Sequence, residues 1–372
     1  MSKRFCLLLE DDWELMGDGS GNVASHQYLP TLFLLKIAGQ LNIKVTFMVD
    51  VAQQLTFIEH QNEDSNVKIQ KQLWDDTVRL MKENGFDVQL HLHPQWINAT
   101  FKDGFFHIGR NRNLGTYDSS FQSKLLQESV EYLHALLRPI DSGYKVQAFK
   151  AGFWGLQPFG TLQKHFVQSG IKLILGVRKG LKIPSASVDY EGLEEDTLPY
   201  YPDANDINKL ATDKAGVIVL PLAYYSPDLI TLAGLTLHLL KRRFFAFSSD
   251  HSYLFPNPPL SNEKFNHHKW NEKIRLSARP YLTHLKIGDQ PFSYLKASFD
   301  AVVRRLRRYE IERVPIVIES HTKLYVNNYA DIARFLRYIV EKYEKEVEFI
   351  DLKTFIEEIE RDLCPVRRCH ES

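Results

Sequence analysis

Strand-like and helix-like segments alternate along almost the whole chain, and this alternation restricts the possible folds more than any other feature. Short apolar runs rich in β-branched and aromatic residues predict strands, and stretches with helical spacing between them predict helices. The predicted strands are Lys3–Glu10, Lys44–Val49, Asp87–His93, Val146–Phe149, Lys172–Leu175, Gly216–Leu220, Val314–Glu319 and Val347–Ile350. The predicted helices are Leu29–Leu41, Val67–Asn84, Ser120–Leu137, Thr161–Ser169, Phe292–Tyr309, Tyr329–Tyr343 and Leu352–Arg361. This order indicates an α/β fold in which a parallel sheet, closed or nearly closed into a barrel, lies inside its helices.

The composition is that of a globular protein without a strong charge bias. The chain has 372 residues, of which 44% are hydrophobic, and a formal net charge of zero. It therefore has enough apolar material for a large core, and nothing favours nucleic acid as a partner. Cys6, Cys364 and Cys369 make no disulfide framework. The first apolar run is too short, and becomes acidic too soon, for a signal peptide, so we expect a cytoplasmic protein.

One apolar stretch, Leu229–Phe247, tests whether the chain could cross a membrane. His238 and the basic residues 241–243 interrupt it before it reaches the roughly 18–20 residues that a bilayer requires. We therefore expect no transmembrane span and interpret the stretch as a buried helix. An interfacial helix with a basic step, and so a peripheral membrane contact, is the alternative.

We expect a single barrel domain over residues 1–361, followed by a C-terminal tail over 362–372. Insertions are expected near 97–118, 185–210 and 250–290, where turn-forming and aromatic residues occur without periodicity. Loops of this size inside a compact domain are often functional.

Clusters of polar residues follow four of the predicted strands. They are Glu10–Asp12, His91–Trp96, Lys150–Trp154 and Glu319–His321. In barrels and open α/β sheets the functional sites lie at the carboxyl ends of the strands. The four clusters are therefore expected to meet at one site.

His91 and His93 are two residues apart, so both can project from the same face of a strand that ends at Pro94. A pair of neutral imidazoles suits a metal ion, and one carboxylate from the acidic cluster would complete a set typical of catalytic zinc or ferrous iron. A second carboxylate could then act as a base. The alternatives are a histidine pair that hydrogen-bonds within a polar turn and an acidic loop that faces solvent.

Two further clusters offer chemistry at the same site. His321 could donate a proton to a leaving group, or it could simply hydrogen-bond the backbone. Lys150, Gly152 and Trp154 supply a cation, a position for close approach and an aromatic wall. Aromatic faces beside polar groups suit sugar rings, although they also occur in ordinary cores.

These four clusters, in this order, resemble the polysaccharide deacetylase family, carbohydrate esterase family 4, in its branch with a short His-x-His-Pro motif. The resemblance extends from about Arg4 to Phe355. Its residues are Leu8–Asp12, Val45–Val49, His91 with His93, Phe149–Gly152, Asp189–Tyr200 and Glu319–His321. The fold that it implies is a distorted (β/α) barrel of the (β/α)7 type, with fewer than eight regular units.

The resemblance also implies roles for individual residues. Asp12, His91 and His93 would bind a divalent metal. Zinc is the first choice, and iron, cobalt and manganese are the alternatives. Asp11 would be the catalytic base and His321 the acid. Lys150 stands where the family usually has an arginine that orients the base, and this change replaces a bidentate fork with a point charge. The histidines are two residues apart rather than the commoner four, and Glu14 could replace one ligand. Gly152, Trp154 and Trp96 would contact the substrate.

The expected function is that of a metal-dependent amide hydrolase that removes an acyl group, most simply acetyl, from an N-acylated sugar or a glycan intermediate. The alternative is a carbohydrate-binding or assembly protein that has the same barrel with a vestigial metal site. A metal barrel of the broader amidohydrolase kind fits less well, because those barrels place a His-x-His motif on the first strand.

Overall fold

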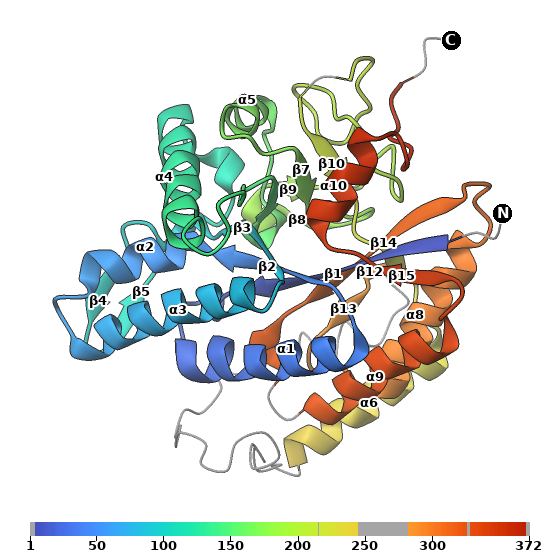
Figure 1. Cartoon of the computed structure of the whole chain (residues 1–372), viewed down its shortest axis with the longest axis horizontal. Coiled ribbons are helices and arrows are strands. Elements are labelled where there is room, and N and C mark those ends of the chain that lie inside the picture. Colours follow the sequence, from blue (N-terminus) through green and yellow to red (C-terminus); the bar gives the residue numbers. More distant parts are fainter. Residues whose placement is uncertain (1–3, 215, 245–281, 326–327, 370–372) are drawn as a thin grey trace.

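The computed structural model describes residues 4–214, 216–244, 282–325 and 328–369, and its main element is a nine-stranded parallel sheet (Figure 1). The strand order is β10-β7-β6-β3-β2-β1-β14-β13, and β15 also pairs with β1. The strands are β1 Arg4–Trp13, β2 Val45–Asp50, β3 Asp87–Leu92, β6 Ala148–Ala151, β7 Leu173–Leu175, β10 Ile218–Leu220, β13 Lys286–Ile287, β14 Arg313–Ser320 and β15 Val347–Phe349.

Every pairing in this sheet is parallel. The longest ladder joins β1 to β14 and runs from Arg4 opposite Arg313 to Asp11 opposite Ser320. Within the described ranges no ladder joins β10 to β13, so the sheet is a half-barrel rather than a closed one. The predicted α/β architecture, a distorted barrel with outer helices, is confirmed.

Helices cover both faces of the sheet. They are α1 Leu29–Leu41, α2 Val51–His60, α3 Ser65–Glu83, α4 Ser119–Leu137, α5 Gly160–Gln168, α6 Leu229–Phe244, α8 Phe292–Leu306, α9 Tyr329–Lys342 and α10 Leu352–Glu360. Helix α10 packs on one face, which we call the inner face, against a small apolar core that includes Cys6, Leu8 and Val317 (Figure 1). Most other helices pack on the opposite, outer face, where the larger core lies.

Several boundaries differ from those predicted from the sequence. Strand β1 continues three residues beyond Glu10, and α2 follows β2 directly although no helix was predicted there. The expected insertion near 97–118 contains a hairpin made of β4 (Thr100–Lys102) and β5 (Phe105–His107). Two short antiparallel pairs, β8 (Lys182–Ile183) with β9 (Val188–Asp189) and β11 (Tyr224–Tyr225) with β12 (Thr283–His284), were also missed.

The expectation of a buried helix at Leu229–Phe247 is only partly correct. Leu232 of α6 is buried, but Leu229, Ile230 and Leu237 are more than half exposed. Residues 245–281, which include most of the expected insertion near 250–290, lie outside the described residues. None of the helices that the structure describes has both the length and the apolar character to cross a membrane.

A buried carboxylate ties the start of β3 to its neighbours and makes stability depend on pH. The Asp87 side chain accepts hydrogen bonds from Gln89 Nε2 (2.9 Å), Thr46 Oγ1 (3.2 Å) and the Lys353 backbone N–H (3.3 Å). Burial raises the pKa of Asp87 to about 6, whereas an unfolded chain releases this proton near about pH 3.9. Between these values the folded state binds more protons, so this group lowers the free energy of unfolding as the pH rises.

We predict that Asp87→Asn removes this contribution. The free energy of unfolding of the wild type should fall, relative to that of the variant, by up to about 1.4 kcal/mol per pH unit between about pH 4 and pH 6. Urea unfolding at several pH values measures both curves. Asp76→Asn, at an exposed position on α3, is the control and should run parallel to the wild type. Parallel curves for Asp87→Asn would contradict the prediction.

Candidate active site

Successive side chains of a strand point to opposite faces of the sheet, and this alternation brings the polar clusters to the inner face. On β1, Glu10 and Asp12 have the same parity as Cys6 and Leu8, which lie in the inner core. The same rule directs His91 of β3, Lys150 of β6 and Glu319 of β14 to this side. Apolar residues therefore fill the inner face beneath α10, and charged residues occupy it toward the carboxyl ends of the strands.

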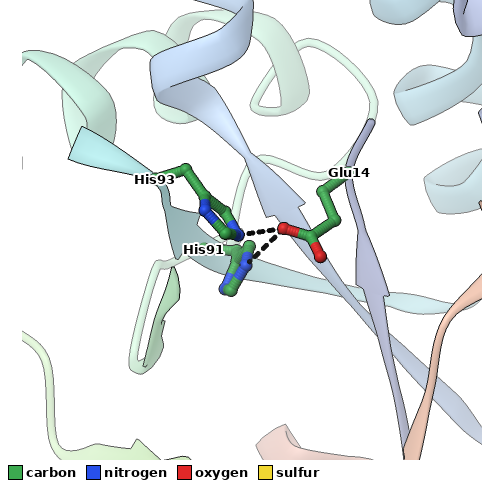
Figure 2. Close-up of side chains that lie close together, drawn as sticks. All are labelled: Glu14, His91 and His93. Atoms are coloured by element: carbon green, nitrogen blue, oxygen red, sulfur yellow. Dashed lines mark hydrogen bonds and ion pairs between the residues drawn. The ribbon is translucent and has the colours of Figure 1, made fainter. Parts of the chain in front are cut away.

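Glu14, His91 and His93 form the first group of candidate metal ligands (Figure 2). The Nε2 atoms of both imidazoles approach the same oxygen of Glu14, at 3.2 Å for His91 and at shorter range for His93. All three side chains are buried. Glu14 follows the end of β1, whereas the histidines lie at the end of β3, so strand β2 separates them in the sheet.

Surrounding groups hold these side chains in place. His91 donates its Nδ1–H to the Lys150 backbone carbonyl, at 2.9 Å. The His93 backbone N–H donates to Asp50 Oδ1 at 3.1 Å, and the Gln95 side-chain amide lies 2.8 Å from His93 Nδ1. Since the other ring nitrogens are occupied, both Nε2 atoms face Glu14. Such outer partners commonly orient histidine ligands of metals.

The donor set fits a divalent cation. Because the Nδ1–H of His91 is used by a carbonyl, a neutral His91 directs the lone pair of Nε2 at a carboxylate oxygen. Two electron-rich atoms at this distance are stable only with a cation between them or with a proton on the ring. Two imidazoles and one carboxylate are a common set for catalytic zinc. Glu14, His91 and His93 are thus the residues that would hold a metal.

The groups that contact Glu14 keep it ionised. Burial alone would raise the pKa of this carboxyl, but His93 and Lys323 outweigh it and hold the pKa well below its usual range. The Lys323 ammonium contacts Glu14 Oε1 and also donates to the Leu15 carbonyl at 3.1 Å. Contacts within the protein are therefore sufficient to keep Glu14 in its carboxylate form, which is the form that binds a metal.

Asp12, Glu319 and His321 form a second group beside the first. His321 Nε2 lies 3.4 Å from Asp12 Oδ2 and 3.7 Å from Glu14 Oε1, so it connects the two groups. Its Nδ1 lies 3.6 Å from Glu319 Oε1. Burial, with help from the charges of Lys286 and Lys323, lowers the pKa of His321 well below its usual range, so the resting imidazole is neutral.

A buried lysine occupies the centre of this second group. Lys150 Nζ lies 2.6 Å from Glu10 Oε1, 2.8 Å from Glu319 Oε2 and 2.9 Å from Asp12 Oδ1. Burial opposes its charge, but the three carboxylates raise the pKa of Lys150 well above its usual value. The second group therefore already contains its cation, which makes the first group the better place for a metal.

The structure separates the two neighbouring aspartates. Asp11 has the opposite parity on β1, and its carboxylate accepts hydrogen bonds from the Thr322 backbone N–H (3.0 Å) and Oγ1 (2.9 Å). Asp11 thereby links β1 to the segment after β14, and burial raises its pKa to about 7. Asp11 belongs to neither group of candidate ligands and Asp12 belongs to the second, and the expected roles of Asp11 as base and Asp12 as metal ligand stay predictions. Glu14 is the acid that meets the histidines, and Asp12 lies beside them.

The aromatic residues after β6 have a strained backbone. Phe153 and Trp154 have φ values of 52° and 56°, in the left-handed region that is costly for non-glycine residues. The Phe153 ring packs edge-on against His93, with 5.7 Å between centroids. Trp154 Nε1–H donates to Glu319 Oε2 at 3.3 Å. Both rings thus border the two groups of polar residues, and the expected contact of Trp154 with a substrate stays a prediction.

The other two residues expected to contact the substrate have different surroundings. A Cβ atom on Gly152 would lie 2.6 Å from the His93 ring, so this glycine makes room for a candidate ligand. Trp96 is buried and packs edge-on against Phe57 and Phe106 in the outer core. Trp96 therefore belongs to the scaffold behind the histidines.

Sequence reasoning missed several residues of the site. His284 Nε2 lies 2.7 Å from Glu319 Oε1, and Lys286 Nζ lies 3.9 Å from the same atom. Lys323 and Asp50 support the first group. Asp50 directly follows the predicted strand Lys44–Val49, and Lys323 lies four residues after the predicted strand end at Glu319, which was a usable signal. His284 and Lys286 lie in a stretch without periodicity, and nothing in the sequence indicated them.

Comparison with known proteins gives a match by structure only. No protein-family model and no curated protein matches the sequence. A crystal structure of a Mycobacterium smegmatis protein assigned as a polysaccharide deacetylase aligns with 100% of this chain and 96% of its own, with a TM-score of 0.51 and 13% identity. At this level of identity the comparison shows a shared fold, and it does not show a shared function.

Two further crystal structures align over similar lengths. A Pseudomonas aeruginosa PAO1 protein with the same assignment covers 97% of this chain and 92% of its own, with a TM-score of 0.49 and 14% identity. An allantoinase covers 96% of this chain and 91% of its own, with a TM-score of 0.48 and 14% identity.

We predict that Glu14→Ala and His91→Ala each abolish stoichiometric metal binding, whereas Asp12→Asn retains it. Loss of an outer partner typically costs 10–100-fold in metal affinity, so loss of a ligand should cost more than about 100-fold. Elemental analysis after dialysis against a fixed free zinc concentration measures the occupancy. His107→Ala, an exposed histidine, is the control. Metal retained in Glu14→Ala but lost in Asp12→Asn would assign the carboxylate ligand to Asp12.

We also predict that Gly152→Ala weakens metal binding by about 10–100-fold, because the new methyl group displaces the His93 ring. Competition with a chromophoric chelator measures the affinity. Gly192→Ala is the matched control, since a Cβ there meets nothing within 4 Å. Equal affinities for the two variants would show that the position of the His93 ring does not matter for binding.

Proposed function

We propose that this chain is a metal-dependent amide hydrolase that removes an acyl group, most simply acetyl, from an N-acylated sugar or glycan intermediate. The observation that carries the proposal is the meeting of the His91 and His93 imidazoles with the Glu14 carboxylate, beside a second carboxylate, in a polysaccharide deacetylase-like half-barrel. Zinc is the metal that we propose. When bound, it would polarise the amide carbonyl and lower the pKa of water.

Asp12 is the base in this proposal. Its carboxylate lies on the same face as the histidines, and the Lys150 ammonium, 2.9 Å from Oδ1, fixes its position. Oδ2 remains directed toward His321 at 3.4 Å. A carboxylate held in this way can take the proton of the attacking water, and general base catalysis contributes about 10²–10⁴-fold to the rate.

His321 passes the proton to the departing amine. Since its resting imidazole is neutral, it must first receive a proton before it can donate one. Asp12 Oδ2 is the neighbouring group that can supply it to Nε2. The amine then leaves with the proton from Nε2, which returns the imidazole to its neutral form.

The aromatic residues after β6 suit a sugar ring. Phe153 lies against His93, and Trp154 is anchored by Glu319 and by its carbonyl, which accepts from the Tyr190 hydroxyl at 2.6 Å. Rigid aromatic faces next to a polar cluster are the usual surroundings of a bound carbohydrate. This arrangement supports a sugar substrate over a peptide.

A second candidate function follows from Lys150. Three carboxylates surround this lysine, so Asp12 shares its cation with Glu10 and Glu319. If that network holds Asp12 too firmly to accept a proton, the site would bind a metal and a sugar without turnover. The chain would then be a carbohydrate-binding or assembly protein.

We predict that Asp12→Asn keeps its zinc but lowers acyl release at least about 100-fold. The assay measures acetate and free amine from a panel of N-acetylated sugars and chitooligosaccharides. Asp11→Asn is the matched control, because Asp11 is adjacent in sequence but faces the other side of β1; it should keep most activity. If only Asp11→Asn loses activity, then Asp11 is the base. Zinc and sugar binding by the wild type without any acyl release would favour the second candidate.

A further inference from the structure

A partly exposed arginine stands over an aromatic residue that packs against His93, one of the candidate metal ligands. The Arg112 guanidinium carbon lies 4.2 Å from the centroid of the Phe153 ring, a cation–π contact. The Phe153 ring also packs edge-on against His93. Arg112 is thus one aromatic ring away from an imidazole of the first group.

The backbone that carries Arg112 is fixed on both sides. The preceding residue, Asn111, accepts a hydrogen bond from the Tyr117 hydroxyl at its carbonyl, at 2.9 Å. The following residue, Asn113, is buried and donates from Nδ2 to the Gln157 carbonyl at 2.7 Å. Arg112 is therefore held at a defined position rather than carried on a free loop.

The same loop also contacts the histidine group from another direction. The Gly109 backbone N–H donates to the Gln95 carbonyl at 2.8 Å, and the Gln95 side chain lies 2.8 Å from His93 Nδ1. The loop after β5 is thereby fastened to the groups that orient His93. Its position relative to the candidate metal ligands is set by these contacts.

The charge of Arg112 is not neutralised by any carboxylate that the described part of the chain provides. Its contact there is the Phe153 ring, which leaves the guanidinium N–H groups available. By contrast, the exposed Arg307 and the partly buried Arg313 both pair with glutamates. An arginine stacked on an aromatic face presents its edge as a planar fork, which suits a phosphate or a carboxylate.

We infer that Arg112 binds an anionic group of the substrate, and that the substrate is an N-acylated sugar that carries a phosphate or a carboxylate. This inference rests on the proposed function and narrows its substrate class. With the acyl group near Glu14 and His93 and the sugar ring against Phe153, the anionic substituent lies at the edge of Arg112. Arg112 is a specificity residue in this scheme and takes no part in the proton transfers.

The test uses zinc-loaded full-length protein and the amine products, which do not turn over. Titration calorimetry compares glucosamine with glucosamine 6-phosphate, glucosamine 1-phosphate and glucosaminuronate. The wild type should bind at least one anionic ligand about tenfold or more tightly than glucosamine, and Arg112→Gln should lose this difference. Arg112→Lys should keep part of it. The pattern among the three anions distinguishes a phosphate from a carboxylate and a C1 from a C6 position.

Arg110→Gln is the matched control, because Arg110 lies exposed on the same loop and should leave the preference intact. Zinc content and melting temperature establish that each variant is folded. With the acetylated forms, Arg112→Gln should raise KM for the anionic sugar about tenfold and leave kcat nearly unchanged. Equal losses in Arg110→Gln and Arg112→Gln, or no preference for anions in the wild type, would overturn the inference.

Different results would contradict the substrate inference and the hydrolase proposal. If the protein releases acetate from neutral sugars and Arg112→Gln changes nothing, the substrate inference is wrong and the hydrolase proposal stands. If zinc does not bind, or no sugar of either kind is deacetylated, the hydrolase proposal fails. An anion preference that depends on Arg112 would in that case still assign a binding site for an anionic sugar.

Discussion

The site depends on one buried interaction, the contact of the Lys150 ammonium with three carboxylates. Glu10, Asp12 and Glu319 come from β1 and β14, whereas Lys150 comes from β6 on the other side of β2 and β3. A charge without exposure to water is tolerated only when it is paired, and breaking a buried pair costs about 3–5 kcal/mol. The ion cluster thus joins strands that are not neighbours in the sheet across the inner face of the half-barrel.

This network leaves the first group available for a metal. Lys150 supplies the cation for Glu10, Asp12 and Glu319, and Lys323 supplies one for Glu14 on the side away from the histidines. The Nε2 atoms of His91 and His93 both approach Glu14 Oε2. These electron-rich atoms need a positive charge between them. Lys150 therefore has a structural role here, in addition to any role in orienting Asp12.

Much of the fold and part of the site could be predicted from the sequence. The strand–helix alternation was sufficient for the parallel sheet, and the His-x-His spacing was sufficient to place both imidazoles on one face. The sequence did not show which faces Asp11 and Asp12 occupy, because the first strand was predicted to end at Glu10. Since β1 continues to Trp13, Glu10 and Asp12 share a face while Asp11 lies on the other, and Glu14 follows directly at the site.

The sequence by itself determined which residues can carry the chemistry, because periodicity and strand ends are local properties of the chain. Tertiary structure alone decided which of them meet. Asp12 lies with Lys150 and His321, Glu14 lies with His91 and His93, and His284 reaches Glu319 from a short strand that no local pattern indicated. The reason is that contacts between residues far apart in the sequence depend on the order and curvature of the strands, which no spacing along the chain encodes.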